Sequence, residues 1–146
     1  DRRADMPGEF SLPIRVYIED TDAGGIVYYV NYLKFLERAR TEFMRSLGVH
    51  RAALTDDGQI FVVSQLSVSY LLPAKLDDEI VATALAHQVG GATIDFTQTV
   101  RRTDQLLLKA EVQVACVDRT SGRPRRLGSS IRERLLAATK IEKDRV

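Results

Sequence analysis

The sequence predicts an α+β domain in which one long helix packs against an antiparallel sheet. The first observation is a helical period, in which apolar residues recur at steps of three and four at Tyr32, Leu36, Ala39, Phe43 and Leu47. The second is a set of four runs in which apolar and polar residues alternate, at 61–72, 79–89, 93–102 and 106–118. Because turn residues separate these runs, successive strands are expected to be joined by hairpins.

The N-terminal elements follow from changes in the apolar period. An alternating apolar run at 14–18 predicts a short strand, and an acidic, glycine-containing turn follows at 19–25. The long helix comes next, and Gly48 suits the left-handed residue that ends a helix. Residues 48–59 are expected to form a loop, with a short helical turn around 51–54.

The later elements are delimited by their turn residues. Gly90-Gly91 marks a hairpin between the second and third alternating runs. Gly128-Ser129-Ser130 offers an N-cap for a final short helix that runs through Leu136. Small residues in the second run suit a sheet that curls closely around the helix, namely Ala82, Ala84 and Ala86.

Composition describes one globular domain. The chain has 146 residues, of which 45% are apolar and 28% charged, and this length allows a sizeable core. Its 21 basic and 20 acidic residues are interspersed and give a formal charge of +1, so nucleic acid is not an expected partner. No apolar run approaches the roughly 20 residues that span a bilayer, so no membrane span is expected.

Three segments are expected along the chain. Residues 1–12 are polar and unpatterned and are interpreted as a disordered tail, 13–137 as the single domain, and 138–146 as a C-terminal tail. The first ten residues contain no apolar signal-peptide core, and Cys116 stands alone inside a strand pattern. Both observations favour a cytoplasmic location.

The acidic turn is the candidate site of chemistry. Three carboxylates, Glu19, Asp20 and Asp22, precede a small-residue turn and then the helix. Such a turn delivers a carboxylate beside free backbone N–H groups, where the helix dipole is positive. Asp22 could therefore act as a nucleophile or general base, although it could equally cap the turn or the helix. Glu19 and Asp20 are expected to pair with nearby arginines, from among Arg15, Arg38 and Arg40.

Other side chains near this turn have two interpretations each. Tyr28 or Tyr29 could line a pocket, and Asn31 could orient the carboxylate or serve as a local cap. One Cys and two scattered His residues, His50 and His87, offer no metal-ligand pattern, so no metal or cofactor is expected. Neither His lies in a recognisable nucleophile motif.

The segment YIEDTDAGGIVYYVNY at 17–32 resembles the 4-hydroxybenzoyl-CoA thioesterase family, and more closely its Tol-Pal-associated acyl-CoA thioesterase branch. The similarity continues through LKFLERARTE, YLLPA, LDD and the late Val117-Asp118. It covers nearly the whole chain from Pro13 to about Leu136.

This resemblance implies a hotdog fold, a curved antiparallel sheet wrapped around one long central helix, for residues 13–137. It also implies hydrolysis of acyl-CoA to a free acid and coenzyme A, without a metal or a bound cofactor. Members of the family form homodimers or homotetramers, with active sites at the subunit interface. The alternatives are a non-catalytic dimeric module of the same fold that binds acyl groups or partners, and a thioesterase that acts on acyl carrier protein.

The resemblance also assigns the site residue by residue. It places the catalytic carboxylate at Asp22 and the backbone N–H that polarises the thioester carbonyl at Tyr29. It implies further contacts to the substrate from Gly25, Ile26, Val27, Tyr28, Asn31, Val63 and Ser64. The strand that carries Ser64 is expected to face the partner subunit's active site.

Two positions depart from the family pattern. Tyr29 stands where many members of the branch have His. Residues 90–93 read Gly-Gly-Ala-Thr, where the hydroxybenzoyl enzyme has a basic run that meets the nucleotide phosphates. Phosphate contacts are therefore expected from Arg101-Arg102 or from the group at 123–126, with solvated turns as the alternative.

Overall fold

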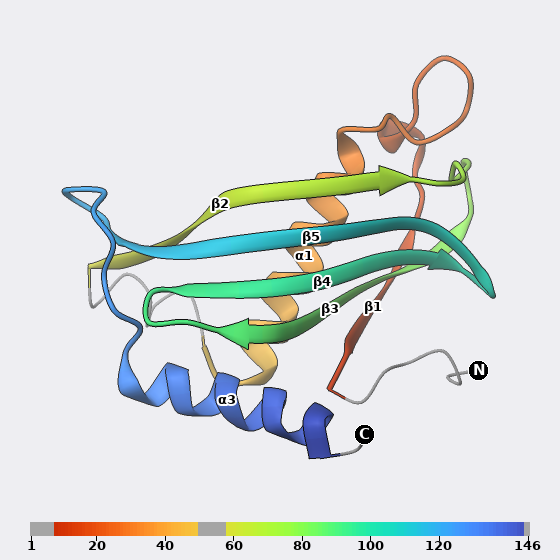
Figure 1. Ribbon diagram of the computed structural model, residues 1–146. Helices are drawn as coiled ribbons and strands as arrows, with labels where there is room; N and C mark the ends of the chain where they lie inside the picture. The colour runs from red at the N-terminus through yellow and green to blue at the C-terminus, as the bar shows by residue number, and fades with distance from the viewer. Residues whose placement is uncertain (1–7, 50–57, 145–146) are drawn as a thin grey trace.

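The computed structural model of the chain describes residues 8–49 and 58–144. Five antiparallel strands form one curved sheet in the order β1-β3-β4-β5-β2 (Figure 1). The strands are β1 (Phe10–Arg15), β2 (Gln59–Tyr70), β3 (Glu79–Val89), β4 (Thr93–Arg102) and β5 (Gln105–Asp118). The helices are α1 (Asn31–Ser46), α3 (Ser129–Asp144) and a short 3-10 helix, Ile18–Asp20.

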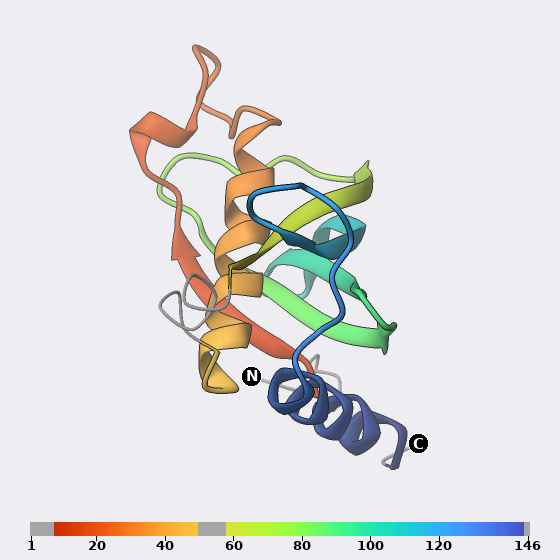
Figure 2. The ribbon, with the colours of Figure 1, turned by 90° about the vertical axis from the view of Figure 1, so that its left-hand side faces the viewer.

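Helix α1 lies against one face of the sheet, and α3 packs across one end (Figure 2). Four residues of the helical stripe expected from the sequence are buried, namely Tyr32, Leu36, Ala39 and Phe43, and Phe35 is buried with them. The fifth expected residue, Leu47, is the C-cap and is only partly buried. Opposite the stripe, the three alanines of β3 are at most 2% exposed. Because their side chains end at Cβ, the helix can approach the sheet closely. The expected α+β layering is thereby confirmed.

The order of the strands corrects one sequence-based expectation. β2 and β3 are consecutive in the chain, but β4 and β5 lie between them, so no hairpin joins β2 to β3. After β2 the backbone N–H groups of Leu71 and Leu72 both donate to Leu107 O, at 2.9 and 3.1 Å. The buried Ala74 then holds the chain against the core. These contacts lead the chain across the end of the sheet rather than back along β2.

Both terminal boundaries also differ from the sequence-based expectation. Residues 10–12, which were assigned to a tail at 1–12, belong to β1, where Phe10 pairs with Ala84 and Leu12 with Ala82. The alternation of apolar and polar residues at 10–12 is too short to indicate a strand. Their antiparallel pairing with β3 gives them the strand conformation. Residues 1–7 lie outside the described residues, as do His50 and the turn expected around 51–54.

Helix α3 extends to Asp144, through most of the expected tail at 138–146. Its buried side chains explain the extension, because Leu135 is fully buried and Thr139 Oγ1 donates to Ala86 O at 3.1 Å. Among the described residues, no helix is long and apolar enough to cross a membrane.

One buried polar residue, Gln98 of β4, connects the sheet to the helix. Its Nε2 donates to Leu36 O at 3.0 Å and to Thr83 O at 2.9 Å. Its Oε1 accepts a hydrogen bond from Arg40 Nη1 at 2.9 Å. Every polar atom of the amide is therefore used, as a fully buried amide requires.

An ion pair fixes the connection between β2 and β3. Asp78 Oδ2 lies 2.6 Å from Arg102 Nη1 and accepts the Lys75 N–H at 2.8 Å. Burial by itself raises the pKa of the Asp78 carboxyl, but hydrogen bonds from Lys75 and Arg102 outweigh it and hold this pKa below its usual value. The ionised carboxylate is therefore the form that stabilises this connection.

We expect Gln98→Leu to lower the free energy of unfolding by about 2–4 kcal/mol, because two carbonyls and one guanidinium lose their buried partner. Chemical denaturation measures this change. Gln88→Leu, at an exposed position of β3, is the matched control and should change stability by less than about 0.5 kcal/mol. Equal unfolding midpoints for the two variants would contradict the assigned role.

We expect the stabilising effect of Asp78 to disappear in acid. The pKa of Asp78 in the folded state lies below its unfolded value of about 3.9. The contribution of Asp78 to the free energy of unfolding is therefore complete above the unfolded pKa and is lost as pH falls through the folded pKa. The difference in melting temperature between the wild type and Asp78→Asn should be constant from pH 7 to about 5 and shrink below about 4. A difference that does not shrink in acid would contradict this role of Asp78.

Candidate active site

The acidic turn forms a small hairpin between the 3-10 helix and α1. Thr21 and Val27 form an isolated β-bridge, and Asp22 N donates to Ile26 O at 3.0 Å. Gly25 closes the turn with a φ of +79°, a conformation that a side chain makes costly. The Gly24-Gly25 pair therefore permits the tight reversal that exposes Asp22.

The Asp22 carboxylate is exposed but is held in place by the backbone. Its Oδ1 accepts the Gly24 N–H at 2.9 Å. Within residues 8–49 and 58–144, its second oxygen accepts no hydrogen bond. Asp22 thus caps the turn, one of the two alternatives read from the sequence, while leaving one oxygen available for chemistry.

Asp22 does not cap the helix, the second alternative read from the sequence. Residues 23–30 separate it from the first helical residue, and the N-cap of α1 is Val30, which makes no side-chain capping bond. The extra length is used by the hairpin, which projects beyond the body of the domain (Figure 1). Asp22 therefore belongs to this hairpin and does not cap the helix.

An unused backbone donor lies just before α1. Asn31 N donates to Tyr28 O at 2.8 Å, and Leu33 N donates to Val30 O at 3.0 Å. In the described part of the chain, the Tyr29 N–H donates to no acceptor. It lies at the positive end of the helix dipole, where a developing negative charge is stabilised.

Aromatic rings surround this helix end. The Tyr29 side chain is 58% exposed, and its ring lies 5.1 Å from that of Tyr28 and 6.0 Å from that of Tyr70. Tyr70 Oη donates to Tyr29 O at 3.2 Å. Burial, together with neighbouring Tyr29 and Tyr32, raises the pKa of Tyr70, so its phenol remains a donor at neutral pH. The sequence does not reveal this role, because Tyr70 alternates with polar residues like any apolar member of a strand.

Two of the residues expected to contact the substrate also hold the turn. Val27 is 4% exposed and donates its N–H to Ala74 O at 2.9 Å. Asn31 Nδ2 donates to Asp20 O at 2.9 Å, so of its two proposed roles the structure supports the local one. Of the remaining candidates in the turn, Gly25 accepts the Leu76 N–H at 3.1 Å and Ile26 stays exposed.

Asp20 and Arg15 have partners other than those expected from the sequence. Asp20 Oδ2 accepts the Tyr17 N–H at 2.9 Å and so caps the 3-10 helix. Arg15 pairs with Glu79 at 3.1 Å, across the β1–β3 ladder, rather than with an acid of the turn. Cross-strand register, which the sequence does not reveal, decides this partner.

A groove of about 950 Å³ runs between α1 and β2. One wall is the strand, with Phe61, Val63 and Leu66, and the other is the helix, with Leu33 and Met44. Glu37, Arg40 and Thr41 add polar groups to the helix wall. Asp22 and Tyr29 are not among the residues that line this groove.

Val63 and Ser64 lie apart from Asp22 within one chain. A bulge between Val63 and Gln65 interrupts the β2–β5 ladder, and Ser64 Oγ donates to Gln113 Oε1 at 2.9 Å. The Tyr70 end of the strand, and not Val63 or Ser64, contacts the helix start. The expected site residues therefore form two separate groups in a single chain.

The two arginine groups considered for phosphate binding differ in their engagement. Arg102 is held by Asp78, by Pro73 O and by Gln105 Oε1, so the solvated-turn alternative is replaced by a structural role. Arg125 lies 3.9 Å from Asp118. Arg123 and Arg126 are exposed. In the described residues, no three or more His, Cys, Asp or Glu side chains are arranged to hold a metal.

Known proteins with similar sequences include two that are named for acyl-CoA thioester hydrolysis. Acyl-CoA thioesterase YbgC of Haemophilus influenzae is 50% identical over 110 residues, which cover 75% of this chain and 81% of that protein. Acyl-CoA thioester hydrolase YbgC of Escherichia coli is 43% identical over 123 residues, which cover 84% and 92%.

Solved structures agree with the fold. A probable thioesterase from Bartonella henselae is 31% identical, with a TM-score of 0.78 over 82% of this chain and 99% of that one. A DHNA-CoA thioesterase from Staphylococcus aureus has a TM-score of 0.88 over 94% and 95% at 18% identity, a likeness of fold alone. The expected hotdog architecture is thereby confirmed.

The sequence profile of the thioesterase superfamily matches residues 24–109, which include the end of the acidic turn, all of α1, the strands β2, β3 and β4, and the start of β5. Together with the relative at 50% identity, this match shows that the chain belongs to the thioesterase superfamily.

Proposed function

We propose that this protein hydrolyses acyl-CoA thioesters to a free acid and coenzyme A, with Asp22 as nucleophile or general base. The observation that carries the proposal is the geometry of the turn. Gly24 fixes one carboxylate oxygen at 2.9 Å and leaves the other free, on a hairpin that leads to the unused Tyr29 N–H. The names of the relatives at 43–50% identity support acyl-CoA as the substrate class.

A thioester requires little more than these two groups. In the nucleophilic route, the carboxylate attacks the carbonyl carbon, coenzyme A leaves as its thiolate, and water then hydrolyses the mixed anhydride. In the general-base route, the carboxylate takes a proton from water as that water attacks the same carbon, the C–S bond then breaks, and coenzyme A leaves as its thiolate and takes up the proton. In both routes the Tyr29 N–H donates to the carbonyl oxygen as negative charge develops there.

The assembly we propose is a homodimer, or a homotetramer built from such dimers, that pairs through β2. β2 is a free edge of the sheet in the single chain, 12 residues long. Apolar side chains are exposed along β2, where Val63 is 49% and Leu66 45% exposed. A long apolar edge is an association site. Two-fold pairing there would bring Val63 and Ser64 of one subunit to the active site of the other.

A cytoplasmic location is part of the same proposal. Cys116 is buried in β5, with its Sγ donating to Gln59 Oε1 at 3.3 Å, and burial raises the pKa of its thiol. An unreactive, unpaired thiol suits a reducing compartment.

We expect Asp22→Asn and Asp22→Ala to fold normally and to lose at least about a hundredfold in turnover of acyl-CoA. The Asn variant keeps an oxygen to accept the Gly24 N–H, so it tests chemistry without removing the turn. Glu19→Gln, at an exposed position of the 3-10 helix that precedes the hairpin, is the control and should keep its activity. Near-wild-type turnover by Asp22→Asn would refute the catalytic assignment and favour a binding module of this fold.

We expect a lysine on the β2 edge to weaken the assembly, because a charge at a buried interface costs free energy. Light scattering at micromolar concentration should show a lower mass for Leu66→Lys than for the wild type. Leu136→Lys on α3, a position of similar exposure, should leave the mass unchanged. A fully active wild-type monomer would overturn the proposed assembly.

A further inference from the structure

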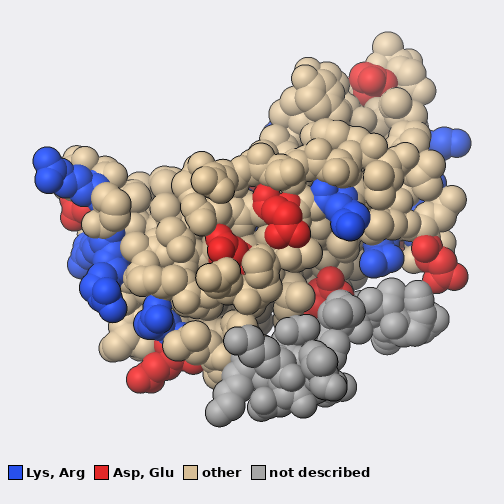
Figure 3. Space-filling view, in the orientation of Figure 1, with Lys and Arg blue, Asp and Glu red and all other residues tan. Residues whose placement is uncertain are grey.

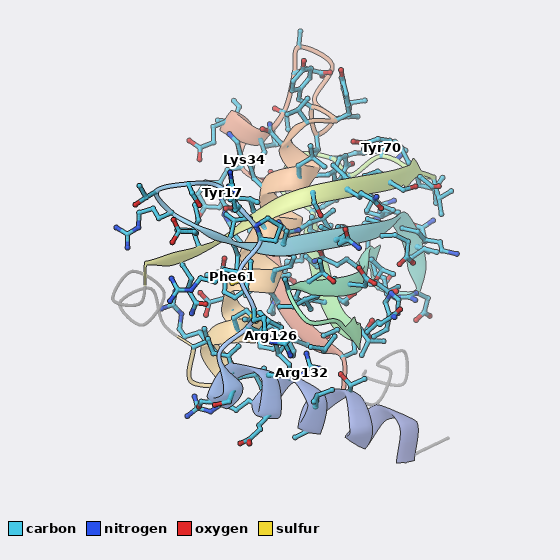
Figure 4. The ribbon with its side chains drawn as sticks, turned by 60° about the vertical axis from the view of Figure 1, so that its left-hand side comes forward. Tyr17, Lys34, Phe61, Tyr70, Arg126 and Arg132 are labelled. Atoms are coloured by element: carbon cyan, nitrogen blue, oxygen red, sulfur yellow. The ribbon has the colours of Figure 1, made fainter. Side chains whose placement is uncertain are left out.

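The end of β2 reaches the start of α1 through one hydroxyl group. Tyr70, the last residue of β2, donates from Oη to Tyr29 O at 3.2 Å, and the two residues are 41 positions apart in the sequence. Figure 4 shows Tyr70 at the end of the domain from which the hairpin projects, opposite α3. The hydroxyl of Tyr70 therefore contacts the residue whose N–H we propose as the donor to the thioester carbonyl.

The helix by itself holds the carbonyl of Tyr29 weakly. Its donor from the first turn, Tyr32 N, lies 3.4 Å from Tyr29 O. The neighbouring carbonyls, Tyr28 O and Val30 O, accept corresponding hydrogen bonds of 2.8 and 3.0 Å. A backbone hydrogen bond of 3.4 Å lies beyond the usual range and is weak. The hydroxyl of Tyr70 thus adds a second donor at the carbonyl that the helix constrains least.

A constraint on the Tyr29 carbonyl also limits the direction of the Tyr29 N–H. The N–H shares a peptide plane with Tyr28 O, and the hydrogen bond that Tyr28 O accepts holds this plane at one point. A plane held at one point can still turn about that bond. The next plane carries Tyr29 O, and the two planes are joined only through the φ and ψ rotations of Tyr29. The contact from Tyr70 to the second plane therefore restricts how far the N–H can turn.

The hydroxyl of Tyr70 is itself held by rigid surroundings. The Tyr70 ring lies 6.0 Å from the Tyr29 ring, edge to face, and 5.8 Å from the Tyr32 ring. Its backbone pairs with Leu108 in the β2–β5 ladder. Groups that are built on strands are held more precisely than groups on loops. The contact to Tyr29 therefore starts from a fixed point of the sheet.

The acidic turn is held separately, by backbone groups of the connection that follows Tyr70. Ala74 O accepts the Val27 N–H at 2.9 Å, and an isolated β-bridge joins Ile26 to Lys75. These contacts do not use the Tyr70 side chain. A change confined to the Tyr70 hydroxyl therefore leaves the turn that carries Asp22 in place.

The surface around the helix start makes the direction of this donor important. The exposed side chains of the 3-10 helix and the hairpin are largely apolar or aromatic, and Ile18 at 76% and Tyr28 at 46% exposure are examples. The surface of the hairpin is mostly uncharged on the face that Figure 3 shows. Such a surface offers few cations to a developing oxyanion. A backbone N–H stabilises that charge only when it points at the oxygen.

We propose that Tyr70 is a positioning residue, whose hydroxyl orients the Tyr29 N–H toward the thioester carbonyl. This inference rests on the proposed acyl-CoA thioesterase function. In this role Tyr70 contacts neither the substrate nor the reacting atoms, and it acts through the backbone of Tyr29. The role belongs to the hydroxyl and not to the ring, because a phenylalanine ring would keep the packing against Tyr29 and Tyr32.

Steady-state kinetics test this role. Tyr70→Phe should lower kcat for acyl-CoA about three- to tenfold with KM nearly unchanged, because an oriented donor acts mainly on the charge of the transition state. Its melting temperature should change by less than about 3 °C, since Tyr70 is 46% exposed and water can satisfy the freed carbonyl. Tyr17→Phe, which loses a hydroxyl at a 63% exposed position, is the control and should match the wild type. An unchanged kcat in Tyr70→Phe, with or without a raised KM, would overturn the proposal.

Infrared spectroscopy of a bound analogue tests whether the donor points at the carbonyl. The probe is a ketone analogue of acyl-CoA, in which a methylene group replaces the thioester sulfur, so that it binds without being hydrolysed. A hydrogen bond from the Tyr29 N–H lowers the stretching frequency of the isotope-labelled carbonyl. This lowering should be smaller in Tyr70→Phe than in the wild type and should be complete in Tyr17→Phe. Equal frequencies in the three proteins would overturn the proposal, even if kcat had fallen.

A measurement without substrate separates failure of this inference from failure of the proposed function. NMR relaxation gives the order parameter of the Tyr29 N–H, which is about 0.85 for a rigid backbone amide and below about 0.6 for a flexible one. If the wild type hydrolyses no acyl-CoA, the proposed function fails and the order parameters decide on the role of Tyr70. A rigid Tyr29 N–H in the wild type and Tyr17→Phe, with a clearly lower order parameter in Tyr70→Phe, would support it. Equal order parameters in the three proteins would overturn it.

Discussion

The close approach of α1 to β3 is the contact on which the rest of the structure depends. Ala82, Ala84 and Ala86 have no atoms beyond Cβ, so the helix lies deep in the curve of the sheet. At that depth its backbone and the side chain of Arg40 need polar partners, and Gln98 supplies them. A helix fixed in this way has its N-terminus fixed as well, and the orientation of the Tyr29 N–H follows from packing that lies well away from it.

The same packing leaves the domain incomplete on one side. α1 covers β1, β3 and part of β4, while β2 at the far edge keeps Val63 and Leu66 largely exposed beside an open groove. A single helix is too narrow to cover five strands. The free edge is thus a consequence of one helix serving a wide sheet, and it marks where a second copy would complete the core.

Local patterns in the sequence predicted much of this fold. Contacts between segments that are distant in the sequence could not be predicted from such patterns. The helical stripe from Tyr32 to Phe43 and the alternation of β5 each needed only neighbouring residues. The position of β2 beside β5, and the pairing of Arg102 with Asp78, depend on segments that meet only after folding. For the site, the turn that carries Asp22 could be predicted, because the glycines that permit it lie beside Asp22 in the sequence. The role of Tyr70 could not be predicted, because this residue lies more than 40 positions further along the chain.

The exposure of the candidate groups connects assembly to chemistry. In a single chain, Asp22 and Tyr29 both face water, where a hydrogen bond to a developing oxyanion replaces one that water already makes. The same donor stabilises that charge far more strongly in a site from which water is excluded. A partner strand laid along β2 would supply this exclusion without moving either group. On the proposed function, subunit pairing would then do more than complete the sheet, because it would lower the effective dielectric constant around the thioester carbonyl at the moment charge develops.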